Sequence, residues 1–203
     1  MKKGLKYLIS ILVLALVAYN SVYFKKLDEV KAAGTSTAFN ASKYAREFYN
    51  SKLLTHLDSA VELGQLVAAM KSAPDKAFTD YSHSLDIGNI RYFMVRGEGK
   101  INRIGEDDLI LDSGVRIATE FVYGNAIRDA SGLIKLNEFN STADFNSVSE
   151  EINKIIRTDV LPTIKQNAKP GDMVKFSGAI ELNQAHVNLD SLEIIPIKLV
   201  IQK

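Results

Sequence analysis

Few residues in this chain have the types and spacing that catalysis requires. The 203-residue sequence contains three histidines, His56, His83 and His186, and no cysteine. Ser82 and Ser84 flank His83, but side chains on adjacent residues seldom face each other. Without cysteine, disulfides, thiolate catalysis and zinc–thiolate sites are excluded. The histidines also lack metal-ligand spacing, so the sequence predicts no catalytic residue, no metal site and no cofactor.

Two further motifs resemble ligand loops but lack their geometry. The run from Gly97 to Lys100 has the glycines of a phosphate loop, but it opens no helix whose backbone N–H groups could hold an anion. The acidic runs at residues 106–108 and 112–114 do not follow the alternating Asp-x-Asp-x-Asp-Gly pattern of a calcium loop. Turns between strands favour Asp, Ser and Gly in any case. We therefore interpret both motifs as structural.

Four polar residues beside glycine-defined bends are the candidates for a ligand or partner surface. Arg96 precedes Gly97, whereas Asn125, Arg128 and Asp129 follow Gly124. Loops held on a rigid scaffold often carry function, which favours a contact role for these side chains. The alternative is that Arg128 and Asp129 pair with each other and cap a turn.

The N-terminus has the pattern of a membrane segment. Residues Tyr7 to Phe24 carry no charge, and eighteen helical residues rise about 27 Å, close to a hydrocarbon core of about 30 Å. Lys2, Lys3 and Lys6 precede this run and mark the cytoplasmic end. We predict a single-pass signal-anchor over residues 1–26 in the inner membrane, with the body in the periplasm or outside the cell. Whether the segment is cleaved stays open.

The charge of the body excludes nucleic-acid binding. The whole chain has 25 basic and 24 acidic residues, but five lysines flank the N-terminal apolar run. The remainder has 20 basic and 24 acidic side chains, a net charge of −4. A mildly acidic body lacks the basic surface that binds phosphate backbones.

The order of elements predicts an α+β fold with a five-stranded OB-like barrel. Residues 27–38 form a linker, 39–84 a helical region packed on the barrel, and 85–203 the barrel itself. Ile90 to Tyr123 contains three consecutive strands, with a bend or bulge permitted at Gly97 and Gly99. A helix then precedes two closing strands, as in the OB fold. An α+β sandwich with helices on one face is the competing arrangement.

Finer predictions concern where these elements begin and end. Ser59 with Glu62, and Ser147 with Glu150, have the spacing of capping boxes. Residues 125–129 read as an irregular link and 133–139 as a short strand. A break is expected near residues 55–58, a helix end at 72–74, a helical turn at 74–81 and a kink at 157–162. Pro196 indicates an edge or bulged final strand.

Several separate segments resemble, in order, a family of predicted periplasmic lipoproteins, domain of unknown function 2291. The resemblance extends from about Phe39 onward and implies an OB-like barrel with added N-terminal helices, in operons for sugar uptake that are often of ribose type. It implies no activity and no catalytic residues. Many members carry a lipid-attachment cysteine, which this chain lacks. The segments that carry the resemblance are Leu53-Leu54, Phe93–Gly99, Gly124–Ala130, Phe139-Asn140 and Val174–Ala179.

These observations predict a membrane-anchored, non-catalytic binding or accessory module linked to sugar uptake. Its partners would be the membrane, through the N-terminal helix, and a sugar transporter component or a small solute. One alternative is a structural docking subunit of an envelope complex that uses the helical region as its surface. Another is an envelope hydrolase, although the sequence offers no nucleophile–base pair for it.

Overall fold

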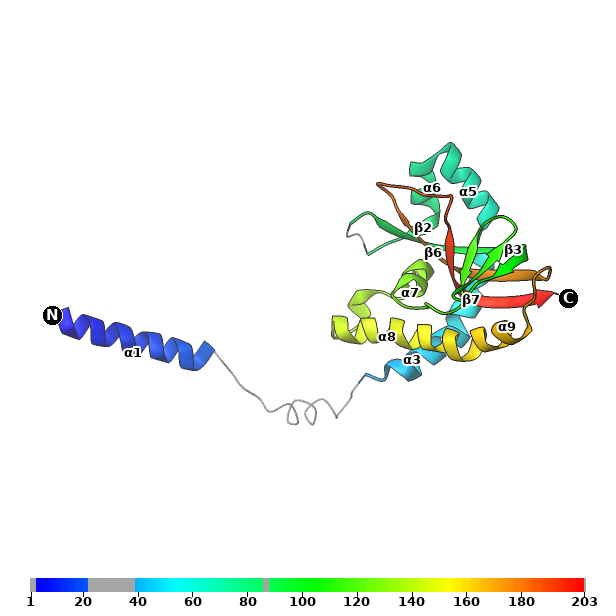
Figure 1. The fold of residues 1–203 in the computed structure, drawn as a ribbon. Helices are drawn as coiled ribbons and strands as arrows, with labels where there is room; N and C mark the ends of the chain where they lie inside the picture. The colour runs from blue at the N-terminus through cyan, green and yellow to red at the C-terminus, as the bar shows by residue number, and fades with distance from the viewer. Residues whose placement is uncertain (1–2, 22–38, 86–87, 203) are drawn as a thin grey trace. The chain divides into compact units, whose positions relative to one another are not determined.

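The computed structural model describes residues 3–21, 39–85 and 88–202, in two compact units, Met1–Phe39 and Asn40–Lys203 (Figure 1). In the first unit, α1 (Lys3–Ser21) is a helix with exposed apolar side chains such as Leu8 and Ile11. Within the described ranges, no helix combines the length and apolar character needed to cross a membrane. The N-terminal helix is therefore confirmed, but its transmembrane role is not supported. The predicted linker, 27–38, lies outside the described residues.

The second unit is built on a closed barrel of five strands. β3 pairs with β4, β4 with β5, β5 with β7, β7 with β6, and β6 closes the circle against β3. All neighbours are antiparallel except β5 and β7, which run parallel. The predicted OB-like barrel is thus confirmed, and the sandwich is wrong. The strands are β3 (Ile90–Ile104), β4 (Asp108–Leu111), β5 (Arg116–Ala118), β6 (Met173–Asn183) and β7 (Glu193–Gln202).

The first half of β3 is covered on both faces, as its apolar sequence predicts. Phe93 and Met94, which point to opposite faces, are both buried. α5 (Leu63–Ser72) and α6 (Pro74–Tyr81) provide one cover, with the rings of Phe78 and Phe93 centred 5.5 Å apart. Two short strands, β1 (Val61–Glu62) and β2 (Ser82–His83), also pair with this part of β3.

Gly97 and Gly99 allow neighbouring side chains to press against β3. A Cβ at Gly97 would lie 2.8 Å from Cζ of Phe176, and one at Gly99 would lie 2.9 Å from Cδ1 of Leu111. The irregular register of β3 falls instead between Ile101 and Arg103. The expectation of a bulge at the glycines is therefore wrong, because both pair with β6 in an unbroken register, whereas the alternative of a bend there stays a prediction.

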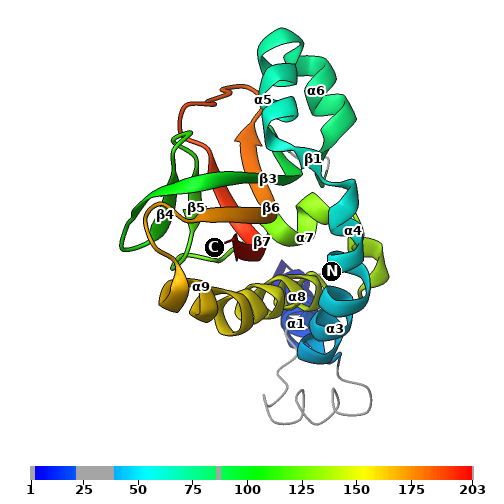
Figure 2. The ribbon, with the colours of Figure 1, turned by 90° about the vertical axis from the view of Figure 1, so that its right-hand side faces the viewer.

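The segment from Asn125 to Asp129, predicted as an irregular link, begins a buried helix. Every residue of α7 (Ala126–Ser131) is buried, and the helix lies against β3 and β6 at the base of the barrel (Figure 2). The prediction is wrong because this segment, although polar in sequence, is buried in the structure. Arg128 and Asp129 pair with each other, which allows two charges to enter the core.

A long helical segment follows α7 and runs below the barrel. α8 (Thr142–Ile155) starts at the cap Ser141, whose side chain accepts a bond from the backbone of Asp144, so the capping box predicted at Ser147 is wrong. A π-helical turn, η5 (Ile156–Val160), joins it to α9 (Leu161–Asn167), which confirms the predicted kink. Between α7 and α8 the chain forms η4 (Leu136–Glu138), a 3₁₀ turn where a strand was predicted.

The first helices of the body lie against α8 rather than against the sheet. Figure 2 shows α3 beside α8 at one end of the barrel, with α5 and α6 at the other end. Phe139 packs between α3 and α8, because the centre of its ring lies 5.4 Å from the ring centres of both Tyr44 and Phe145. The helical run consists of α3 (Ala41–Phe48), η2 (Tyr49–Leu53), α4 (Leu54–His56) and η3 (Leu57–Ser59).

Other predicted boundaries can be compared with the structure. The break near residues 55–58 and the helix end at Ser72 are confirmed, but Glu62 caps α5 without a side-chain bond, so no capping box forms. β5 ends at Ala118, and Phe121 is exposed, so the strand predicted to Tyr123 is too long. Pro196 stands opposite Gly178 at a register shift, which confirms the predicted bulge.

Tyr49 connects the helical run to the barrel. Its hydroxyl donates a 2.9 Å hydrogen bond to the carbonyl of Ile197 on β7. Burial, followed by the nearby carboxylate of Asp159, raises the pKa of Tyr49 to about 12. The neutral phenol is therefore part of the folded structure over the physiological range.

We expect Tyr49→Phe to lower the free energy of unfolding by about 1–2 kcal/mol, because the Ile197 carbonyl loses its donor. The raised pKa of Tyr49 also makes the free energy of unfolding depend on pH. The contribution of Tyr49 is fully present below its ordinary pKa of 10.0 and is lost as the pH rises towards about 12. Urea unfolding at neutral and alkaline pH measures both effects.

The matched control is Tyr81→Phe. The Tyr81 hydroxyl accepts a bond from Gln65 at the surface, so its loss should change the free energy of unfolding by no more than about 0.5 kcal/mol. Equal losses in the two variants would contradict the role given to Tyr49.

Candidate functional site

The barrel wall opens where β6 and β7 separate. β7 pairs with β6 from Gln202 back to Ile195, and then its first residues pair with β5 instead. The last residues of β6, up to Asn183, pair only with the start of β3. The two strands therefore diverge around Glu181 and Glu193, and no strand of the described part of the chain fills the space between them.

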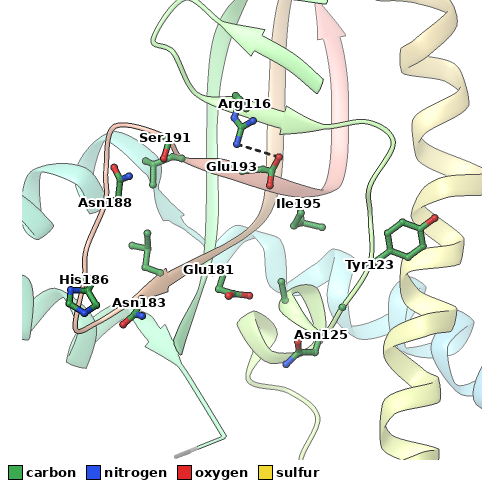
Figure 3. A pocket seen from close by; sticks show the side chains of 14 residues that line it. Arg116, Tyr123, Asn125, Glu181, Asn183, His186, Asn188, Ser191, Glu193 and Ile195 are labelled. Carbon is green, nitrogen blue, oxygen red and sulfur yellow. Dashed lines mark ion pairs between the residues drawn. The ribbon is translucent and has the colours of Figure 1, made fainter. Parts of the chain in front are cut away.

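This opening is a cavity of about 430 Å³, which we call the β6–β7 cavity (Figure 3). Its volume lies within the range of about 300–1,000 Å³ that small-molecule sites occupy. The loop joining β6 to β7 forms one side, and the start of α7 forms another. Its polar lining residues are Arg116, Asn125, Glu181, Asn183, His186, Asn188, Ser191 and Glu193.

The lining supplies many hydrogen-bonding groups and carries two carboxylates, those of Glu181 and Glu193, against the single guanidinium of Arg116. Arg116 lies 3.7 Å from Glu193 and 3.8 Å from Asp108, so carboxylates neutralise its guanidinium. Glu181 adds an exposed carboxylate with no ion pair among the described residues. A phosphate or other anion would meet two carboxylates here. The lining therefore suits a neutral solute that both donates and accepts hydrogen bonds.

A second hollow, the α8 groove, lies beside the first and has a volume of about 660 Å³. The two hollows share the segment Tyr123–Asn125. In the groove this segment faces α8 and η5, and one bond from each of these elements holds the chain at residues 122–124. Asn153 donates to the Gly124 carbonyl over 2.8 Å, and Arg157 donates to the carbonyl of Val122.

Three of the four predicted site residues come together below the opening. Asn125 lines both hollows, and its amide donates to Asp129 and, over 3.1 Å, to the hydroxyl of Tyr92. Burial raises the pKa of Tyr92. Arg128 and Asp129 lie deeper, only 2% and 5% exposed, with Nε of the arginine 2.7 Å from the carboxylate.

The remaining bonds of Arg128 are also internal. Its guanidinium donates to the Phe145 carbonyl and to Asn146, each over 3.2 Å, and lies 3.6 Å above the centre of the Phe145 ring. This geometry supports the alternative in which Arg128 and Asp129 hold local structure. Of the two, only Arg128 reaches the α8 groove.

Arg96 stands apart from the other three residues. It lies on β3 in a different hollow, where it is 3.6 Å from Glu62 and donates to the Asp58 carbonyl. The structure therefore does not bring the four predicted residues into one site.

The three histidines do not gather in one site. His56 contacts the hydroxyl of Ser59, and His83 lies on β2, where burial, followed by the charge of His56, lowers the pKa of His83. Ser82 donates to the Phe78 carbonyl instead of facing His83. Only His186 lines the β6–β7 cavity. In the part of the chain that the structure describes, no three His, Asp or Glu side chains are grouped to hold a metal ion.

The sequence patterns did not mark the residues of the β6–β7 loop as a site, although this loop joins the last two strands. In OB folds the loop between strands four and five often contributes to binding. This property of OB folds could have marked Asn183 and His186 as candidate site residues from the sequence. Glu181 and Arg116 could not be marked in this way, because they line the cavity only where β6 and β7 diverge.

The family match follows from comparison of the sequence with family models. The model for predicted periplasmic lipoproteins of DUF2291 matches residues 12–200. The chain belongs to this family. The resemblance seen in the sequence motifs is therefore confirmed, although the chain has no cysteine to carry a lipid.

The fold also matches a solved structure. The DUF2291 chain is similar to an OB-fold protein from Thermotoga maritima MSB8, with a TM-score of 0.73 and 24% identity. The match covers 82% of this chain and 100% of the other. At this identity the likeness supports the fold alone. No curated protein matches the sequence.

The buried pair generates a stability prediction. We expect Arg128→Met to lower the free energy of unfolding by about 3–5 kcal/mol, because Asp129 would be left as an unpaired buried charge. Thermal and urea unfolding measure the loss.

Arg96→Met is the matched control, because Arg96 forms a half-exposed ion pair and should contribute no more than about 1 kcal/mol. If Arg128→Met unfolded like the parent protein but lost a binding activity, Arg128 would be a contact residue and not a support for α7.

Proposed function

We propose that this protein is a periplasmic, non-catalytic module that binds a small polar solute and assists sugar uptake. The observation that carries the proposal is the polar cavity where β6 and β7 diverge. Its amides, carboxylates and single guanidinium offer the mixed donors and acceptors that bind neighbouring hydroxyl groups. The family description, predicted periplasmic lipoprotein, agrees with a role in the envelope.

The N-terminal segment has a separate part in this proposal. Lysines precede its apolar run, as in export signals, and α1 exposes large apolar side chains. We infer that residues 1–26 direct export and attach the body to the inner membrane. A transporter component at the membrane would then be the natural recipient of the bound solute.

Binding accounts for the cavity better than hydrolysis does. Glu181 and Glu193 face one opening, but the nearby charged group, Arg116, holds Glu193 in an ion pair. A glycoside hydrolase needs one carboxyl group kept protonated, usually by an apolar pocket. Both glutamates are exposed, which favours binding over acid–base chemistry.

We expect a neutral pentose or hexose to raise the melting temperature of the protein by about 3–6 °C at about ten times its dissociation constant. Glu181→Ala should abolish most of this shift without lowering the melting temperature of the free protein, because Glu181 is exposed and unpaired. A thermal-shift screen of ribose, xylose, arabinose, glucose and galactose measures both.

Glu151→Ala is the control, since Glu151 lies on α8, pairs with Lys154 and lines neither hollow. The Glu151→Ala variant should keep the full rise in melting temperature on adding the sugar. If no sugar shifted the melting temperature and only protein partners co-purified from membranes, the docking-subunit alternative would replace this proposal.

The proposed attachment predicts where the protein is found in cells. The full chain should sediment with inner membranes and resist high-salt washing, because apolar burial is insensitive to salt. A chain lacking residues 1–26 should lose both export and membrane association. Recovery of the full chain in the cytosolic fraction would contradict the proposal.

A further inference from the structure

The β6–β7 cavity and the α8 groove meet at a single backbone segment. Tyr123, Gly124 and Asn125 line both hollows. The side chains of the two outer residues are held aside by their own contacts. Figure 3 shows the Tyr123 ring turned away from the cavity, towards the neighbouring helix. The Arg157 guanidinium lies 4.7 Å from the centre of this ring, and the Asn125 amide donates hydrogen bonds to Tyr92 and Asp129.

Gly124 leaves the passage between the hollows open. The residue is exposed, its φ is +80°, and a Cβ placed there would meet no atom within 4 Å from any residue other than its chain neighbours, Tyr123 and Asn125. The Asn153 amide bonds the carbonyl oxygen of Gly124, and the side chains of Tyr123 and Asn125 have their own partners, so the Cα of Gly124 stays uncovered in the direction of a Cβ. A ligand can therefore pass over Gly124 from one hollow to the other.

The α8 groove offers the same chemistry as the cavity. Its helical side is a stripe of residues three or four apart, which lie along one face. Glu150 is exposed and forms no hydrogen bond or ion pair within the described residues. The Ser149 hydroxyl is buried without a hydrogen-bond partner there. The members of the stripe are Ala143, Asn146, Ser147, Glu150, Asn153 and Arg157.

Charge and length restrict the ligand class. Arg157 offsets Glu150, and Arg128 is neutralised by Asp129, so the groove has no excess of either sign. The stripe from Ala143 to Arg157 spans about 21 Å of helix, several times the length of one sugar ring. The Tyr123 ring, in a residue that is 62% exposed, adds an apolar face at the junction.

We propose that the two hollows form one extended site for a neutral oligosaccharide, with one unit in the β6–β7 cavity and further units in the α8 groove. This inference rests on the proposed binding function and names its ligand as a chain of sugar units. The bound chain would cross Gly124, and Glu150 would accept hydrogen bonds from its hydroxyl groups.

Calorimetric titration of the full-length protein tests the proposal with two matched series: glucose, maltose and maltotriose, and xylose, xylobiose and xylotriose. In at least one of the two series, the trisaccharide should bind about tenfold more tightly than the monosaccharide, or better. Glu150→Ala should remove this gain and leave monosaccharide binding unchanged. Glu181→Ala should weaken both, and the control Glu151→Ala should change neither.

Gly124→Asn gives a second test, because asparagine tolerates positive φ better than other residues with side chains. Its side chain should block the passage, removing the gain for the trisaccharide while monosaccharides still bind.

The outcomes separate the two proposals. Monosaccharide binding without any gain for trisaccharides, or equal effects of Glu150→Ala and Glu151→Ala, would overturn the extended site and leave the binding function standing. No binding of any saccharide would overturn both. Binding of tetraglycine with the same dependence on Glu150, in place of saccharides, would overturn the sugar class in favour of an extended peptide.

Discussion

The buried ion pair of Arg128 and Asp129 is the interaction on which the base of the barrel depends. Two charges removed from water are costly unless each is fully satisfied. Here the carboxylate accepts from both the guanidinium and Asn125, and the guanidinium also bonds a carbonyl and lies over the Phe145 ring. The pair therefore fixes α7 beneath the strands and α8 beneath α7. Both hollows take their common wall from the residues just before this helix.

The second constraint is the exchange of partners by β7. Because its first residues pair with β5 and the later ones with β6, the wall cannot remain continuous at the point of exchange. The bulge opposite Pro196 adjoins that point, and a proline cannot supply the missing ladder bond. The cavity is thus a consequence of how this barrel closes, and the β6–β7 loop places polar side chains around it.

The charges around the two hollows argue against anionic ligands. Arg116 is flanked by carboxylates and Arg128 by Asp129, so neither guanidinium is free to hold a phosphate. The third guanidinium, that of Arg157, donates to the Val122 carbonyl and lies over the Tyr123 ring. What remains exposed is a set of amides, hydroxyls and carboxylates beside one aromatic ring. Such a surface recognises a ligand through many weak hydrogen bonds, which suits a module that must release its solute to a partner.

The amino-acid sequence by itself determined the class of fold. The order of three consecutive strands, a helix and two closing strands was enough to predict the OB-like barrel, because the signals that mark each element are local. The coverage of β3, the kink before Pro162 and the bulge at Pro196 followed in the same way. The sequence also marked Asn125, Arg128 and Asp129, but could not separate a surface cluster from a buried one.

Only the tertiary structure decided where the hollows lie and which residues line them. The burial of α7 depends on Arg128 meeting Asn146 and Phe145, which are remote in sequence. The β6–β7 cavity depends on strand pairings between β5 and β7, which no local pattern records. Glu181 and Glu193 become neighbours of one opening because two strands diverge in space, and divergence is a property of the closed barrel.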